Sequence, residues 1–252
     1  MSGGARYWVS VGCVSLALAS SVQASIIAPD GRAPDGRTYG QLAAEWWQWA
    51  ISIPRLENPL TDSIGENTYT NQHGPVFFLA PSMGSSYTRK VTLAQGQYLF
   101  FPVLTSIVFN LPEENYTEAE MRQQLDEFNS TASLLYASVD DQVRNIWIYR
   151  NASPAGGFQV TVPEDNIFDS PDNGFDLPGG TYGPAVTDGW WLLVEPLAPG
   201  QHKIHFKGGT GDNDLIQVTT YNITVIPEPG SLALLSLPAL LLRRRTVLGQ
   251  SV

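Results

Sequence analysis

The sequence predicts a mainly β, single-domain protein: a β-sandwich of jelly-roll or immunoglobulin-like type with two flanking α-helices. Short runs of aromatic and β-branched residues recur between turn residues, which is typical of strands. The 252 residues include 23 glycines and 18 prolines, which favours many turns over long helices. No internal repeat and no Gly/Ser-rich linker divides residues 25–226, so we expect this stretch to form one domain.

The first helix is expected in TYGQLAAEWWQWAISIP, residues 38–54. Thr38 and Gln41 have the spacing of a capping box, and Pro54 ends the helix. Apolar residues at helical spacing form one stripe, which we expect to pack in the core: Leu42, Trp46, Trp49, Ala50 and Ile53. Trp47 lies at the edge of this stripe and is the more plausible surface ring.

The second helix is expected in TEAEMRQQLDEF, with Thr117 and Glu120 as its capping box, and it can also extend through Leu135. Three apolar residues should form its buried side: Met121, Leu125 and Phe128. Strands are expected in the remaining apolar stretches: 75–81, 85–104, 105–110, 133–152, 157–163, 189–197, 200–208 and 215–226. Turn residues mark reversals within or between them: Gln95-Gly96, Asp140-Asp141 and Pro199-Gly200.

The charge of the chain excludes one class of partner. Residues 25–226 hold 10 of the 14 basic and 23 of the 24 acidic residues, a net charge of −13. A body this acidic repels phosphate backbones, so we expect no nucleic-acid partner. Neutral glycans and divalent cations are compatible with it.

The N-terminal segment, residues 1–24, reads as a secretory signal peptide. Arg6 precedes an apolar run, and Val22-Gln23-Ala24 is a small-x-small cleavage pattern. The alternative is a lipoprotein anchored at Cys13, but the apolar run before Cys13 is short and Ser10 stands where an aliphatic residue is expected. Cleavage after Ala24 leaves a chain without cysteine, which excludes disulfides and thiolate ligands.

The C-terminal tail has three parts in a fixed order. Pro227-Glu228-Pro229 forms an extended segment, Ser231–Leu242 is apolar, and Arg243-Arg244-Arg245 follows as a basic stop. As a helix the apolar part spans about 18 Å, well short of the roughly 30 Å of a bilayer core. The tail therefore fits a processing enzyme better than permanent anchorage, with an ordinary membrane anchor as the alternative.

This tail resembles the PEP-CTERM sorting signal of Gram-negative bacteria. The resemblance implies recognition by an exosortase-type membrane protease-transpeptidase and transient association with the inner membrane through the tail. It further implies loss of the tail and delivery to the cell surface or the extracellular polymer matrix. The short extension 246–252 after the arginines departs from the pattern, since such tails usually end at the basic cluster.

The body resembles a family of uncharacterised secreted bacterial proteins. Four stretches carry most of the resemblance: YGQLAAEWWQWAISIPRLENPL, QHGPVFFLAP, GQYLFFPV and GTYGPAVTDGWWLLVEPLAPGQHKIHF. Members of that family often have cysteines near the positions of Tyr69 and Val91, where this chain has none. The resemblance implies a single domain and no particular activity.

Aromatic residues are the best candidates for ligand binding. Trp190 and Trp191 are neighbours on an expected strand, so one ring should pack in the core and the other should meet solvent or the helix. A platform that stacks on sugar faces is therefore a hypothesis, with core packing as the alternative for each ring. Its candidate residues are Trp47, Tyr182, Trp190 and Trp191, with Asp188 and Asn173 for hydroxyl contacts.

The acidic loop 164–184 is a candidate calcium site, because calcium prefers oxygen ligands on Gly-rich loops. Its candidate ligands are Asp165, Asp169, Asp172 and Asp176. The spacing does not match an EF-hand, and a solvated acidic loop is the alternative.

Three patterns bear on catalysis, and each is weak. Ser82 in APSMG approximates a nucleophile elbow, but more strand follows it and the chain has only three histidines. His202 and His205 should face opposite sides of one strand and so cannot share a metal. Three carboxylates lie near tryptophans in the sequence and leave glycoside hydrolysis open: Glu45, Asp188 and Glu195.

These observations favour an exported, non-enzymatic component of the cell surface or extracellular matrix, structural or glycan-binding, with extracellular polysaccharide as its partner and calcium as a possible ligand. An extracellular carbohydrate-active hydrolase is the alternative, and a protein-binding adhesin is a further one. A hydrolase should place two carboxylates across a cleft, whereas a binder should present exposed rings. An adhesin should present an exposed apolar patch.

Overall fold

A computed structural model describes residues 24–169, 176–211 and 214–227. Within them the protein is mainly β, with two five-stranded sheets and two α-helices, so the predicted fold class is confirmed. The expected signal peptide up to residue 23 and the sorting tail after Pro227 lie outside the described residues. Among the described residues, no helix is long and apolar enough to cross a membrane.

The first sheet, which we call the helix-side sheet, has the order β1-β3-β8-β6, and β7 also pairs with β8. Its strands are β1 (Val76–Phe78), β3 (Tyr98–Phe109), β6 (Arg150–Ala152), β7 (Phe158–Val162) and β8 (Gly180–Val194). The second, which we call the outer sheet, has the order β2-β10-β9-β4-β5. Its strands are β2 (Ser86–Ala94), β4 (Ala132–Val139), β5 (Gln142–Val143), β9 (Gly200–Thr210) and β10 (Asp214–Ile226). Two pairs are parallel, β1 with β3 and β2 with β10, and the others are antiparallel.

The turns fall where the sequence predicts them, but two of them join different sheets. The chain leaves β2 in the outer sheet, turns at Gly96 and enters β3 in the helix-side sheet. It likewise crosses from β8 to β9 through residues 195–199. The hairpin at Asp140-Asp141 is confirmed, with both residues at the positive φ that a type I′ turn requires. Its second strand, β5, is only two residues long, and a 3-10 helix, η2 (Ile146–Tyr149), follows it.

The main core lies between the two sheets. Alternate residues of β3 and β8 point inward, and β9 and β10 contribute the facing side chains. The rings of Phe101 and Phe206 meet across this core with centroids 4.7 Å apart. Trp190 also packs here, with only 4% of its surface exposed.

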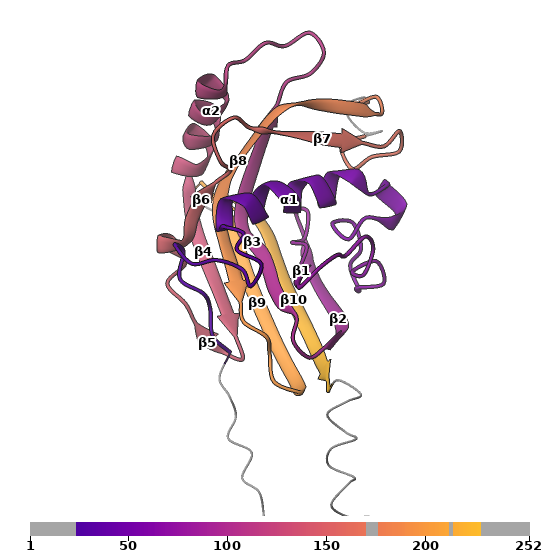
Figure 1. Cartoon of the computed structure of the whole chain (residues 1–252), viewed down its shortest axis with the longest axis vertical. Helices are drawn as coiled ribbons and strands as arrows, with labels where there is room; N and C mark the ends of the chain where they lie inside the picture. Colours follow the sequence, from indigo (N-terminus) through magenta and orange to yellow (C-terminus); the bar gives the residue numbers. More distant parts are fainter. Residues whose placement is uncertain (1–23, 170–175, 212–213, 228–252) are drawn as a thin grey trace, which may run out of the picture.

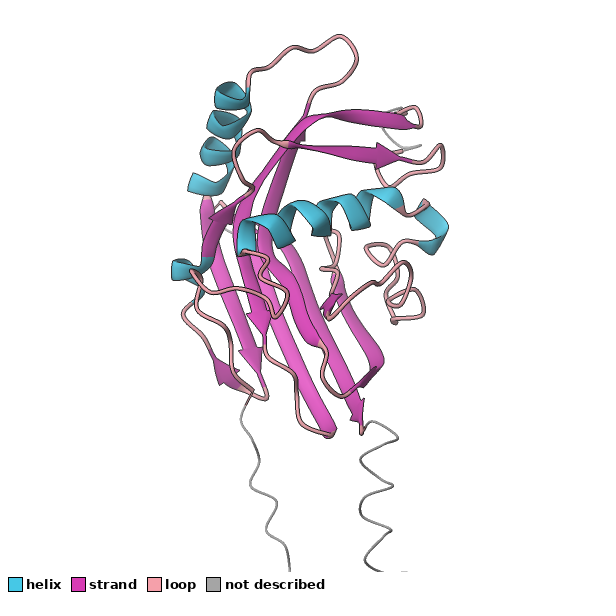
Figure 2. Ribbon diagram, in the orientation of Figure 1, coloured by secondary structure: helices cyan, strands magenta, loops and turns pink. Residues whose placement is uncertain are grey.

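Helix α1 (Tyr39–Ser52) covers the other face of the helix-side sheet, which makes a third layer (Figure 2). The expected capping box at Thr38 is present, and the whole expected apolar stripe is buried. Trp46 packs edge-to-face on Trp191, whose ring stacks on Phe100 at 5.3 Å between centroids. A short 3-10 helix, η1 (Arg55–Glu57), follows α1.

Helix α2 (Glu118–Ser130) packs against β3 and β8 with its expected capping box at Thr117. Met121 and Leu125 are buried, but the prediction for Phe128 is wrong, because 39% of this residue is exposed. Asn129 takes the buried position instead and accepts a hydrogen bond from the Ser106 hydroxyl. The last turn of α2 therefore faces the sheet with a polar side chain.

Both ends of the described chain lie at the same end of the sandwich (Figure 1). Ile26 forms a β-bridge with Val194, and the buried Ala24 accepts a hydrogen bond on its carbonyl oxygen from Arg144. At the C-terminal end of the described residues, β10 ends at Ile226.

Candidate functional site

A half-exposed tryptophan marks the edge of the sandwich beside β6. Trp147, in η2, has 51% of its surface exposed. Its ring meets the ring of Trp190 edge-to-face, with centroids 5.8 Å apart. The indole N–H of Trp190 donates a hydrogen bond to the backbone oxygen of Trp147, at 3.3 Å. An exposed aromatic face is therefore held in place by a buried one.

An arginine and two carboxylates complete this group. The guanidinium of Arg150 lies over the Trp190 ring, 5.5 Å from its centroid. It donates two hydrogen bonds to Asp188 Oδ2, at 3.0 and 2.7 Å, and one to Asp126 Oδ1, at 2.8 Å. Burial opposes the charge, but the hydrogen bonds to both carboxylates outweigh it and raise the pKa of Arg150. We call these five residues the Trp147 cluster: Trp147, Trp190, Arg150, Asp188 and Asp126.

Strand pairing brings the cluster together. Arg150 of β6 pairs with Trp190 of β8, and Ala152 pairs with Asp188 two residues away. Residues at a spacing of two share a face, so Asp188 and Trp190 point to the same side of β8. Helix α2 packs on this side through Val186 and carries Asp126 toward Arg150.

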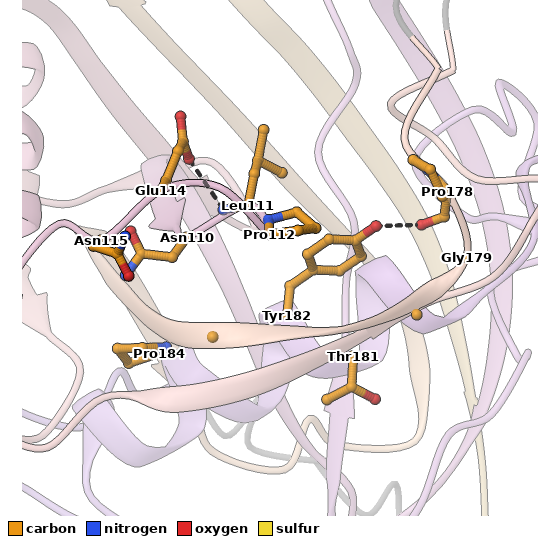
Figure 3. A pocket seen from close by; sticks show the side chains of 12 residues that line it. Asn110, Leu111, Pro112, Glu114, Asn115, Pro178, Gly179, Thr181, Tyr182 and Pro184 are labelled. Carbon is orange, nitrogen blue, oxygen red and sulfur yellow. Dashed lines mark hydrogen bonds between the residues drawn. The ribbon is translucent and has the colours of Figure 1, made fainter.

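A groove of about 620 Å³ opens at the other end of β8. The pairing of β3 with β8 ends at Phe109 and Ala185, and the two segments then diverge. The loop 110–116 forms one wall and residues 178–184 form the other. Figure 3 shows the ring of Tyr182 lying between Pro112 and Pro178.

Hydrogen bonds fix both walls of this groove. The side chain of Asn110 donates to the backbone oxygen of Tyr116 and accepts from its N–H, both at 2.9 Å. Glu114 accepts from the backbone N–H of Leu111 at 3.0 Å. The hydroxyl of Tyr182 donates to the carbonyl of Pro178 at 2.5 Å. The groove is therefore preformed.

The structure separates the five expected glycan residues into three places. Asp188 and Trp190 belong to the Trp147 cluster, and Tyr182 lines the groove. Trp191 is fully buried against α1, so it has no surface on which a sugar can stack. Trp47 is half-buried, and its indole N–H donates to Thr105 at 3.3 Å. The expected single platform does not form.

Three members of the Trp147 cluster were not among the expected site residues: Trp147, Arg150 and Asp126. The stretch Ile146–Tyr149 contains four consecutive large apolar residues at the edge of a fold. They cannot all face the core, because an edge segment has only one buried side. This pattern is the signal that points to an exposed ring.

In the acidic loop, the carboxylate of Asp169 bonds to the backbone of the loop itself. Asp169 accepts hydrogen bonds from the backbone N–H of Asn166 at 3.0 Å and of Leu177 at 3.2 Å. Asp172 lies outside the described residues. Within the described part of the chain, no three His, Cys, Asp or Glu side chains, including Asp165, Asp169 and Asp176, assemble to hold a metal. Calcium binding by this loop stays a prediction.

The residues considered for catalysis are engaged elsewhere. Ser82 is buried, and its hydroxyl donates to the carbonyl of Ser85 at 2.5 Å. His202 pairs with Asp140 and His205 with Thr220 on the opposite face of β9, as expected. The pairing of Glu45 with Arg37 places this carboxylate on the α1 side, across the helix-side sheet from Asp188. These two carboxylates therefore do not face each other across a cleft.

Comparison with known proteins gives little to add. No protein-family model and no curated protein matches the chain. The solution structure of amebosin matches with 13% identity and a TM-score of 0.19, covering 56% of this chain and 96% of its own. PbICP-C in complex with falcipain-2 matches with 13% identity and a TM-score of 0.25, covering 62% of this chain and 100% of its own. Neither likeness carries an argument about function.

Proposed function

We propose that the protein is an exported, glycan-binding component of the cell surface or extracellular polysaccharide matrix. The observation that carries the proposal is the Trp147 cluster, where a half-exposed indole is seated on a buried one beside an ion-paired arginine. The acidic charge of the body is compatible with a glycan and unfavourable for nucleic acid.

The chemistry of the cluster suits a sugar. An exposed indole offers a flat apolar face to the C–H groups of a sugar ring. Carboxylate oxygens accept hydrogen bonds from hydroxyl groups, and guanidinium N–H groups donate to them. The hydrogen bonds of Arg150 to Asp126 and Asp188 hold these polar groups in place before a ligand arrives.

Delivery to the matrix rests on the two ends of the sequence. The signal-peptide pattern of residues 1–24 supports export, and the PEP-CTERM-like tail supports sorting by an exosortase-type enzyme at the inner membrane. The tail enzyme and the polysaccharide are therefore the proposed partners.

The test uses the purified body, residues 24–227, which contains the whole described core, with the producing cell's extracellular polysaccharide. The body should co-sediment with the polymer, and Trp147→Ala should weaken the association about tenfold or more, the loss of one stacked aromatic contact. Ile148→Ala is the matched control, because the neighbouring Ile148 is also exposed but has no aromatic face.

Each alternative has its own outcome in this experiment. Equal losses for Trp147→Ala and Ile148→Ala would favour an adhesin that binds through an apolar patch. Release of shorter sugars would favour a hydrolase. Retention of the polymer by Trp147→Ala at wild-type strength would overturn the proposal.

A further inference from the structure

The groove between loop 110–116 and residues 178–184 is separate from the Trp147 cluster. It uses the β3–α2 connection and the first residues of β8, whereas the cluster uses η2, β6, α2 and the middle of β8. At about 620 Å³, it lies in the size range of ligand sites. Its walls are held by the hydrogen bonds of Asn110, Glu114 and Tyr182.

The lining of the groove excludes two classes of ligand. All twelve lining residues belong to the described part of the chain: three prolines, three glycines, two asparagines, and one each of Glu, Thr, Tyr and Leu. None of them is basic, so a phosphate, sulfate or uronate group would meet no cation there. Leu111 is the only aliphatic one apart from the prolines, so a lipid-like ligand would find little apolar wall.

Polar atoms remain available where a ligand would lie. The exposed side chain of Asn115 and the Oε1 atom of Glu114 have no hydrogen-bond partner among the described residues. Figure 3 places Asn115 beside Asn110 at one end of the groove and Tyr182 near its middle. Amide and carboxylate groups along a preformed groove that has no cation suit the hydroxyl groups of uncharged sugars.

We infer that this groove is a second glycan site, which binds a stretch of uncharged polysaccharide. The inference deepens the proposed function and rests on it for the ligand class. With one site at β6 and another at the start of β8, a single molecule bridges two polymer strands. Two sites on one rigid body raise the overall avidity for a polymer without any new contact.

The groove can be blocked without disturbing the backbone. The three atoms nearest to a Cβ built on Gly180 all belong to the Tyr182 side chain, at 3.7 Å or more, and the φ of Gly180 lies outside the strained range. Gly180→Leu therefore places an aliphatic side chain against Tyr182 inside the groove. Thr161→Leu is the matched control, because the exposed Thr161 lies on the neighbouring strand β7 and does not line the groove.

The experiment titrates the purified body with uncharged oligosaccharides released from the cell's own extracellular polysaccharide, with calorimetry as the readout. We expect two binding sites in the wild type and one in Trp147→Ala. Adding Gly180→Leu to Trp147→Ala should weaken the remaining site about tenfold or more, equivalent to roughly 1.4 kcal/mol. Adding Thr161→Leu should change it less than about twofold.

The outcomes separate this inference from the proposed function. One site in the wild type that Trp147→Ala removes would overturn the groove site and leave the proposed function intact. One site that Gly180→Leu removes and Trp147→Ala does not would support the groove and overturn the Trp147 cluster. No binding by the wild type would overturn both.

Discussion

The two sheets of the sandwich differ in how many faces they bury. The centres of β3 and β8 are buried on both faces, because the outer sheet covers one and α1 the other. In β2 of the outer sheet, exposed residues alternate with buried ones from Thr88 onward. The sequence reflects this: YLFFPVL and WWLLV are continuous apolar runs, whereas TRKVTLA alternates.

A strand whose sequence is continuously apolar, without polar residues at alternate positions, therefore indicates that both faces of its sheet are covered. Adjacent residues of a strand point to opposite sides, so Trp190 and Trp191 need two separate cores. Substitutions on the α1-covered face of the helix-side sheet should therefore lower the free energy of unfolding. Substitutions on the exposed face of the outer sheet should change it little. The predictions below test this contrast in order of decreasing effect.

The largest effect is expected for Trp191→Ala. Its ring is fully buried between Phe100 and Trp46, so the substitution leaves a large cavity and should lower the free energy of unfolding by about 4 kcal/mol. Thr92→Ala, on the exposed face of β2, should change it by less than about 0.5 kcal/mol. Urea unfolding followed by tryptophan fluorescence measures both. Similar values for the two would refute the contrast.

Arg89→Met in the outer sheet should lower the free energy of unfolding by less than Trp191→Ala does. The guanidinium of Arg89 is fully buried and donates to the carbonyls of Pro59, Asp62 and Ala80 and to the Tyr221 hydroxyl.

Methionine would leave these acceptors buried without donors, which should cost about 3 kcal/mol. Lys90→Met is the control, because the neighbouring Lys90 is exposed, and it should be nearly neutral. A neutral Arg89→Met would mean that water replaces the lost donors. Urea unfolding of both variants measures the two changes in the free energy of unfolding.

The smallest effect concerns alkaline pH. Burial raises the pKa of Tyr39, the first residue of α1, and that of Tyr221, between the sheets. The unfolded chain releases these phenol protons near pH 10 while the folded protein keeps them, so stability is complete below about pH 10 and falls as pH rises above it.

Tyr39→Phe and Tyr221→Phe should each remove part of that fall. The loss per residue is at most about 1.4 kcal/mol for each pH unit above 10. The control is Tyr116→Phe, at an exposed position, which should leave the pH dependence unchanged. Urea titrations between pH 8 and 11.5 measure it, and a flat profile in the wild type would contradict the prediction.

Local signals in the sequence predicted the elements well and their partners poorly. The capping boxes at Thr38 and Thr117 and the turn at Asp140-Asp141 depend on neighbouring residues, and all three are confirmed. The crossing from β2 to β3 depends on which sheet each strand joins. A short turn between two strands usually indicates a hairpin, and nothing local distinguishes the two cases.

Only the part of the Trp147 cluster that lies on a single strand could be predicted from the sequence. Asp188 and Trp190 lie two residues apart on one strand, and the sequence identified both. Arg150 and Asp126 reach them only through the pairing of β6 with β8 and the packing of α2, which are long-range events. The sequence left open whether the second tryptophan of the pair meets solvent or the helix, because alternation gives opposite faces but does not say what covers them.

The tail begins at the end of β10, and β10 is an inner strand of its sheet. Nine residue pairs join it to β2 on one side and eleven join it to β9 on the other. A pull on the tail acts along β10, so it loads both hydrogen-bond ladders in shear at once and cannot peel them apart one bond at a time. A tail on an edge strand would lack one of these ladders. A pull at the point where the chain leaves the sandwich is therefore resisted by both ladders together.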